Sequence, residues 1–243
     1  MRRLSPLIPL LFAVALAACG STGNQLSSAD PSANVGRAAL NGGAPEAALQ
    51  VAGNLLTRRP ADPEALLLRA DALATMNRGE EAVAAYQAAL AVTPRSAEAR
   101  LGLGRLLMSV DAAAAEAQFL QALTLNPRSA AAANNLGIAR DLQNRHAEAQ
   151  LAYRQALASQ PTMQAAAVNL ALSLGLSGRA AEAIPILRPI AQSPGATPRI
   201  RHDMAAILAM SGDRNGAANM LQADLSDEEV DRALKVFTGL SRE

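Results

Sequence analysis

Few side chains in this 243-residue chain have the types and spacing that catalysis or metal binding requires. The two histidines, His146 and His202, belong to no cluster of cysteine, histidine and carboxylate with metal-ligand spacing, and we expect His146 to be a solvent-exposed turn residue. Gly102-Leu103-Gly104 begins like a dinucleotide loop without its third glycine, and Gly175-Leu176-Ser177-Gly178 lacks nucleophile-elbow spacing. We therefore expect a protein that is not an enzyme, with no catalytic residue, no metal site and no cofactor.

The only cysteine, Cys19, ends an apolar segment near the N-terminus. Met1-Arg2-Arg3 gives a charged start, and the apolar residues 7–18 are too few for a comfortable transmembrane span. With Leu16-Ala17-Ala18 before the cysteine, this arrangement resembles a bacterial lipoprotein signal. The resemblance implies that residues 1–18 are removed and that Cys19 is lipidated. A plain cleavable signal peptide that happens to contain a cysteine is the alternative.

Processing at Cys19 would leave 20 basic and 21 acidic residues and change the formal net charge from +1 to −1. The chain has no basic run and no interleaving of aromatic and basic residues, so we expect no nucleic-acid partner. Residues 19–32, rich in Gly, Ser, Asn and Gln after the cysteine, predict a flexible tether that reaches roughly 20 Å. Because several acyl chains hold a protein firmly, the lipoprotein resemblance implies stable membrane anchoring. Gly20 stands where an aspartate would favour the inner membrane, so we expect the outer membrane's inner leaflet, with the folded part in the periplasm.

The rest of the chain repeats with a period of about 34 residues, which is typical of solenoids built from helical hairpins. Proline recurs at this interval as Pro60, Pro94, Pro127 and Pro161, and the middle interval is shorter by one. Between the prolines, apolar residues recur at helical spacing in two bursts separated by a polar turn, which predicts one helical hairpin per repeat. Before each of the last three prolines, alanine stands twelve positions away, an aromatic eight away and alanine five away: Ala82, Ala115 and Ala149; Tyr86, Phe119 and Tyr153; Ala89, Ala122 and Ala156.

This pattern resembles the tetratricopeptide repeat. Leu103-Gly104 and Leu136-Gly137 match the pair in its first helix, and the alanine, aromatic and proline columns follow. The resemblance implies an all-α, right-handed superhelical solenoid. We place about six hairpins at residues 33–226, with the first and last degenerate, and a C-terminal capping helix at residues 227–243. An alanine-rich helical bundle with accidental periodicity is the alternative. The large early aromatic of the family is missing, since its position holds Leu66, Arg100, Ala133 and Ala167.

Smaller features of the repeat predict local structure. The unit that ends at Pro127 is one residue short, and we place the gap in its turn, near Val110-Asp111. Ser226, with Glu229 three residues later, predicts a capping box before the last helix. One small residue per repeat is expected where the two helices of a hairpin approach most closely: Ala70, Gly104, Gly137 and Ala171.

In a solenoid of this kind, the first helices of successive hairpins line a concave groove that selects the ligand. The expected surface mixes apolar side chains with asparagines, which suits an amphipathic helix or an extended segment whose backbone the asparagines pair. Alternatively, Leu101, Ile138 and Leu172 pack between neighbouring repeats and bind nothing. By register, the partner-binding candidates are Leu67, Asp71, Leu101, Arg105, Met108, Asn134, Asn135, Ile138, Asp141, Val168, Asn169 and Leu172.

A narrower resemblance lies between residues 185 and 213. Pro185, Pro189, Pro194 and Pro198 interrupt the repeat pattern, and Arg201-His202-Asp203-Met204-Ala205 follows. We expect Pro189 to kink or end its helix. The stretch is similar to one in the tetratricopeptide lipoproteins of the tight-adherence (Flp) pilus machinery, where a related proline-rich stretch precedes Arg-x-Asn-Leu-Ala.

This second resemblance implies a pilotin-like adaptor, anchored in the outer membrane, that helps a secretin channel to localise or assemble for pilus export. The partner would be a protein or peptide segment in the groove, with the pilus secretin as the candidate. The competing function is an adaptor for peptidoglycan enzymes or for outer-membrane protein assembly. An enzyme of unknown type is a third and weaker alternative.

Overall fold

The computed structural model describes residues 31–240, and every regular element in that range is a helix. The expected signal peptide, Cys19 and the tether up to residue 30 lie outside the described residues. The described part contains α1 (Pro31–Asn41), α2 (Pro45–Arg58), α3 (Pro63–Thr75), α4 (Gly79–Val92), α5 (Ala97–Leu107), α6 (Ala112–Leu125), α7 (Ala130–Asp141), α8 (His146–Ser159), α9 (Gln164–Leu176), α10 (Ala180–Ala191), α11 (Pro198–Met210), α12 (Arg214–Leu221) and α13 (Asp227–Leu240).

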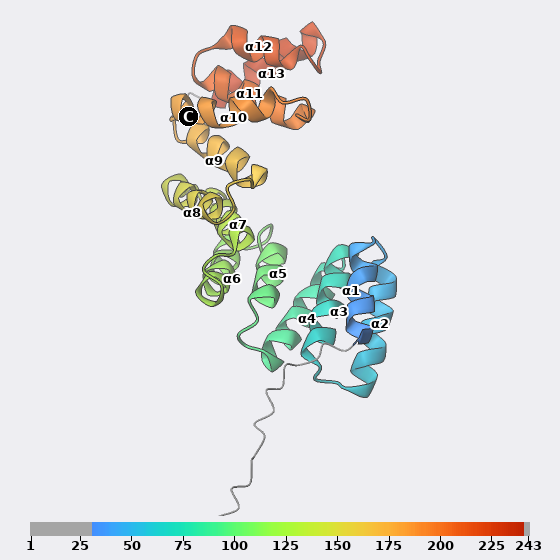
Figure 1. Ribbon diagram of the computed structural model, residues 1–243. Helices are drawn as coiled ribbons and strands as arrows, with labels where there is room; N and C mark the ends of the chain where they lie inside the picture. Colours follow the sequence, from blue (N-terminus) through green and yellow to red (C-terminus); the bar gives the residue numbers. More distant parts are fainter. Residues whose placement is uncertain (1–30, 241–243) are drawn as a thin grey trace, which may run out of the picture.

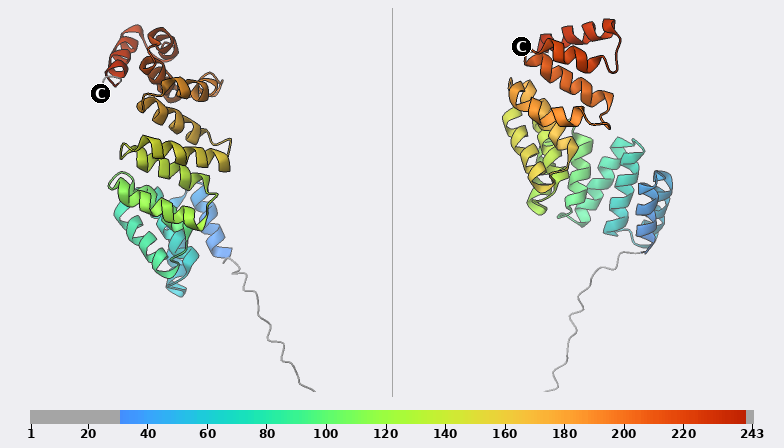
Figure 2. Two further views of the ribbon diagram at one scale, coloured as in Figure 1. Left: turned by 90° about the vertical axis from the view of Figure 1, so that its left-hand side faces the viewer. Right: turned by 45° about the horizontal axis from the view of Figure 1, so that its top comes forward.

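Consecutive helices pack in pairs from α1 with α2 to α11 with α12, and α13 packs against α11 and α12. First helices of successive hairpins also touch, as α3 does with α5 and α7 with α9. The array is therefore a curved stack in which neighbours along the chain are neighbours in space, with α1 at one end and α13 at the other (Figures 1 and 2). The expected all-α solenoid of hairpins is confirmed. None of the helices within residues 31–240 is long and apolar enough to cross a membrane.

The repeated prolines mark the boundaries between hairpins, because a new helix begins three residues after each of the first three prolines. Asp62, Ser96 and Ser129, each two residues after a proline, are the N-caps of α3, α5 and α7. Their side chains accept hydrogen bonds of 3.0, 3.1 and 3.2 Å from the backbone N–H three residues further on. These bonds satisfy a donor that a helix start otherwise leaves unpaired, so they set where each hairpin begins.

The small residues of the first helices allow the aromatics of the second helices to lie against them. A Cβ on Gly104 would stand 2.5 Å from Cε1 of Phe119, and a Cβ on Gly137 would overlap the ring of Tyr153. Both rings are almost completely buried. The prediction that these glycines mark close helix approach is confirmed, and the reason is the ring seated on each.

The second of the four regular hairpins is one residue short in its first half, as the sequence predicted. Its two helices begin at Ala97 and Ala112, whereas those of the next hairpin begin at Ala130 and His146, which are one position further apart. The other turns use a residue with positive φ, such as Asn77 or Asn144, and the turn at residues 108–111 has none. The lost residue has therefore removed the left-handed turn position.

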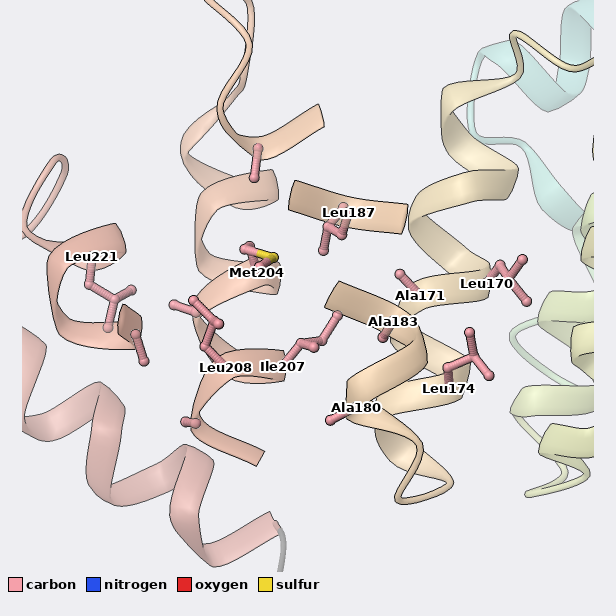
Figure 3. Close-up of a cluster of buried hydrophobic side chains, with 14 of the residues drawn as sticks. Leu170, Ala171, Leu174, Ala180, Ala183, Leu187, Met204, Ile207, Leu208 and Leu221 are labelled. Atoms are coloured by element: carbon pink, nitrogen blue, oxygen red, sulfur yellow. The ribbon is translucent and has the colours of Figure 1, made fainter. Parts of the chain in front are cut away.

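The largest buried cluster joins α9, α10 and α11 (Figure 3). The sequence predicted that Pro189 kinks or ends its helix, and α10 does not end there but continues to Ala191. Pro185 and Pro189 are four residues apart and both exposed, so the missing backbone hydrogen bonds fall on the solvent side. Water can pair the freed carbonyls there, and the opposite face of α10 keeps Ala183 and Leu187 in the core.

The last helix, α13, covers the end of the stack with one apolar face. Val230 and Leu234 are buried in the same cluster, and Ala233 and Phe237 pack against it. At its start the backbone N–H of Ser226 donates to Glu229 Oε2 at 2.9 Å, as in a capping box. The serine hydroxyl, however, donates to the same carboxylate at 2.7 Å instead of accepting from the backbone.

Candidate functional site

All twelve predicted groove residues lie on first helices, in a row from α3 through α5 and α7 to α9, with Met108 at the C-terminal cap of α5. Ten of them are partly buried and Arg105 is exposed. Asn134 is only 5% exposed. The side chains therefore occupy neighbouring helices as expected, and most keep some surface for a partner.

The apolar members of the row pack into the cores between hairpins while remaining partly accessible. Leu67, Leu101 and Met108 contact the clusters of the first hairpins. Ile138, Val168 and Leu172 contact the large cluster around α9. These side chains thus pack between neighbouring repeats, as the alternative interpretation expected. Each also keeps some accessible surface, which a partner could contact.

The asparagines form a polar contact between α7 and α9. Asn169 Nδ2 donates to Asn134 Oδ1 at 3.0 Å, and Asn134 Nδ2 lies 3.5 Å from Asn135 Oδ1. An asparagine side chain has two N–H donors and one carbonyl acceptor. The side-chain N–H donors of Asn135 and the side-chain carbonyl of Asn169 make no hydrogen bond within residues 31–240, so they retain the capacity to pair a peptide backbone.

The two aspartates of the row are used inside the protein. Asp71 accepts a 2.5 Å hydrogen bond from Tyr86, and burial raises its pKa although this bond and Arg105 act to lower it. Asp141 accepts 2.8 Å bonds from the hydroxyls of Tyr153 and Ser173, and thereby links α7, α8 and α9. Burial and the Asp141 carboxylate raise the pKa of Tyr153 well above its usual range. Both carboxylates thus make hydrogen bonds that hold neighbouring helices together.

His146 is not the solvent-exposed turn residue that the sequence suggested. It is the first residue of α8, is partly buried, and places Nδ1 2.8 Å from Asp141 Oδ1. The grouping of Ser173, His146 and Asp141 resembles a catalytic triad only in composition, because the serine hydroxyl donates to the aspartate and not to the imidazole. Within residues 31–240 no group of three or more histidine, cysteine or acidic side chains is arranged to hold a metal.

A second polar network, which the sequence did not reveal, braces the turn between α7 and α8 against α6. Glu116, only 7% exposed, accepts from Arg140 at 2.9 Å, Gln143 at 3.0 Å and Arg145 at 2.5 Å. Burial acts to raise the pKa of Glu116, but these hydrogen bonds outweigh it and hold the pKa below its usual value. Arg145 also pairs with Glu148, so both guanidinium groups of the network are neutralised within the protein.

An open pocket of about 510 Å³ lies beside the short turn, at the row of predicted groove residues. Three predicted residues converge there, Arg105, Met108 and Ile138, and two exposed apolar side chains join them. Val110 is 84% exposed and Leu142 is 58% exposed. Sequence reasoning missed both, and the available signal was the missing residue near Val110.

In the segment that resembles the pilus lipoproteins, Arg201 connects two parts of the last hairpin. Arg201 donates to the backbone carbonyl of Ala196 at 2.7 Å and, from Nε, to Asp224 at 2.7 Å. Its guanidinium thus ties the start of α11 to the chain just before α13, and it lowers the pKa of Asp224. Neighbouring Asp203 has a pKa raised by burial, which Arg199 and His202 oppose.

Sequence-family models of the tetratricopeptide repeat match residues 63–106, 111–161 and 143–197. Together these matches span more than half of the chain. The chain is a tetratricopeptide repeat protein. The predicted groove residues therefore lie in a fold whose stacked hairpins in general present a concave surface to protein partners. A comparison with curated protein sequences found no match.

Several solved structures share the fold of this tetratricopeptide repeat protein at low sequence identity. PilW, described as a widely conserved type IV pilus biogenesis factor, aligns with a TM-score of 0.73 and 22% identity over 81% of this chain and 94% of its own. Pseudomonas aeruginosa PilF aligns with a TM-score of 0.68 and 22% identity over 78% of this chain and 86% of its own. A tetratricopeptide repeat protein from Parabacteroides merdae gives 0.61 and 19% over 86% of each chain. At these identities the likeness establishes the fold.

Proposed function

We propose that this protein is a membrane-anchored adaptor for pilus assembly, which holds a segment of a partner protein in the groove along α3, α5, α7 and α9. The observation that carries the binding role is the row of partly accessible apolar side chains beside Asn135 and Asn169, whose amide groups have bonding capacity left. A side-chain amide that pairs a backbone, next to apolar pockets for alternate side chains, is a general way to hold an extended segment.

Two independent likenesses support a role in pilus assembly. Two of the solved structures that share this fold are PilW and PilF, and PilW is described as a type IV pilus biogenesis factor. In sequence, residues 185–213 resemble TadD, the tetratricopeptide lipoprotein of the tight-adherence pilus machinery. The proposed role is pilotin-like: the adaptor aids localisation or assembly of the secretin channel, with a lipid on Cys19 holding it at the inner leaflet of the outer membrane.

The test is deletion of the gene in its host, followed by measurement of the amount and membrane location of secretin multimers. We expect fewer multimers, or multimers left in the inner membrane, and loss of surface pili. Wild-type protein should restore both, whereas Cys19→Ala should restore neither if the lipid anchor is required. Normal secretin multimers in the deletion strain would contradict the pilotin-like role.

A pair of leucine variants tests groove binding, with the unfolding midpoint of each measured because Leu172 also contacts the core cluster. Leu172→Asp places a charge in the groove, and Leu151→Asp places one on an exposed position of α8, a second helix outside the row. We expect only the first to fail in complementation. Co-purification of full-length protein with peptidoglycan enzymes instead of a secretin would favour the competing adaptor function.

A further inference from the structure

Beside the one-residue deletion in the second regular hairpin, exposed apolar side chains gather around a pocket. Single exposed valines or leucines are ordinary on protein surfaces. Here Val110 and Leu142, 84% and 58% exposed, border one pocket with the partly buried Met108 and Ile138. These apolar side chains are thus gathered at one pocket and not scattered singly over the surface.

The geometry of the stack explains why the pocket is open. First helices of successive hairpins pack against one another at α1–α3, α3–α5, α7–α9 and α9–α11, whereas α5 and α7 approach each other less closely. The shortened α5 ends at Leu107, and the turn that follows does not fill the space in front of α7. The resulting pocket, about 510 Å³, has the size of a small binding site and room for a bulky apolar side chain.

The charge at this pocket is positive. Arg105 is exposed on its rim, and although its charge acts on Asp71 it makes no hydrogen bond or ion pair within residues 31–240. No carboxylate lines the pocket. The nearby acids are committed elsewhere, since Asp71 accepts from Tyr86 and Asp111 caps α6 by accepting from Ala114. An arginine fork is suited to a carboxylate, which it can bind through two parallel hydrogen bonds.

We propose that this pocket, formed by Arg105, Met108, Val110, Ile138 and Leu142, anchors a partner segment that carries a bulky apolar residue with an acidic residue close beside it. The apolar side chain enters between α5 and α7, and the carboxylate pairs with Arg105. The inference rests on the proposed function only in that the groove binds a protein segment. It does not depend on the segment being part of a secretin.

The experiment selects binders from a random displayed peptide library against the immobilised full-length protein in detergent. The enriched peptide is then measured by fluorescence anisotropy against wild type and variants. We expect enriched sequences to pair a bulky apolar residue with Asp or Glu. Val110→Asp should weaken binding about tenfold or more, because it places a carboxylate in an apolar anchor site. Leu151→Asp, on α8 and 63% exposed, is the matched control and should bind as wild type does.

A charge reversal tests the arginine directly. Arg105→Glu should weaken the acidic peptide about tenfold and should bind a peptide with Lys in place of the acid better than wild type does. Circular dichroism should be the same for all variants because Val110 and Arg105 are exposed. Failure to enrich this pattern, or equal binding by wild type and Val110→Asp, would overturn the proposal. So would a concentration-dependent dimer that Val110→Asp abolishes, since a second copy would then occupy the pocket.

These results separate the two proposals. Pocket-dependent peptide binding together with normal secretin multimers in the deletion strain would keep the anchor site and reject the pilotin-like role. Loss of multimers together with unchanged binding by Val110→Asp would do the reverse.

Discussion

Adding one methyl group at Gly137 should destabilise the protein, although alanine is the better helix former. The new Cβ would stand less than 3 Å from three atoms of the Tyr153 ring. That ring is 1% exposed and its hydroxyl is bonded to Asp141, so it cannot swing into solvent. Gly137→Ala must therefore displace either the ring or α7.

The expected magnitude follows from three terms. Overpacking in a dense core costs about 1–3 kcal/mol. Loss of a hydrogen bond to a charged group costs about 1.5–3 kcal/mol, since a displaced ring leaves Asp141. Replacing glycine by alanine within a helix returns about 1 kcal/mol. Gly137→Ala should thus lower the free energy of unfolding by about 3 kcal/mol. With a urea m-value of about 2–3 kcal/mol/M, the unfolding midpoint should fall by about 1 M.

The assay is urea unfolding followed by far-ultraviolet circular dichroism, with Gly53→Ala as the matched control. Gly53 lies within α2, is exposed, and an added Cβ would meet no atom within 4 Å. The same substitution should therefore stabilise the protein there by about 0.5–1 kcal/mol. Opposite signs for the two variants are the expected result. If Gly137→Ala raises the midpoint as Gly53→Ala does, the ring does not constrain the glycine and the packing argument is refuted.

Three further outcomes follow from the polar contacts. The folded-state pKa of Glu116 is lowered, so its contribution is present above the ordinary value of 4.5 and is lost as the pH falls through the lower folded value. Wild type should lose more stability than Glu116→Gln below about pH 4.5 in urea titrations, and parallel pH curves would contradict this. Tyr153→Phe should cost about 1.5–3 kcal/mol in thermal unfolding because Asp141 loses a donor, and an unchanged midpoint would refute the role of the bond. Ser226→Ala removes the hydroxyl bond to Glu229 and should reduce hydrogen-exchange protection in α13 alone, by about 1 kcal/mol, and uniform loss along the stack would disagree.

The repeat columns predicted the fold because each column encodes a contact between neighbours. A small residue on the first helix and an aromatic on the second, as in Gly104 with Phe119 and Gly137 with Tyr153, meet within one hairpin. The proline followed two residues later by Asp or Ser marks the next helix start. Both signals are local, so they survive without knowledge of the distant chain. The same locality made the missing residue near Val110 detectable.

The polar contacts could not be predicted in this way because they do not repeat. Tyr86 bonds Asp71, 15 residues earlier, whereas Tyr153 bonds Asp141, 12 residues earlier, so the carboxylates come from different turns of the first helix. Phe119 has no hydroxyl to bond at all. A carboxylate near an aromatic column is therefore equally compatible with a buried bond and with an exposed groove position until the side-chain directions are known.

The candidate site could likewise be predicted only in part. The repeat period correctly placed its residues on neighbouring first helices and not on second helices. Periodicity could not show which of those side chains remain available to a partner. Asp71 and Asp141 accept hydrogen bonds from tyrosines, whereas Arg105 has no hydrogen-bond partner within residues 31–240. Availability depends on the spacing between adjacent hairpins, and that spacing changes at the turn of residues 108–111, where a residue is missing. A break in a repeat is thus a position at which binding capacity should be sought, because neighbouring first helices approach each other less closely there.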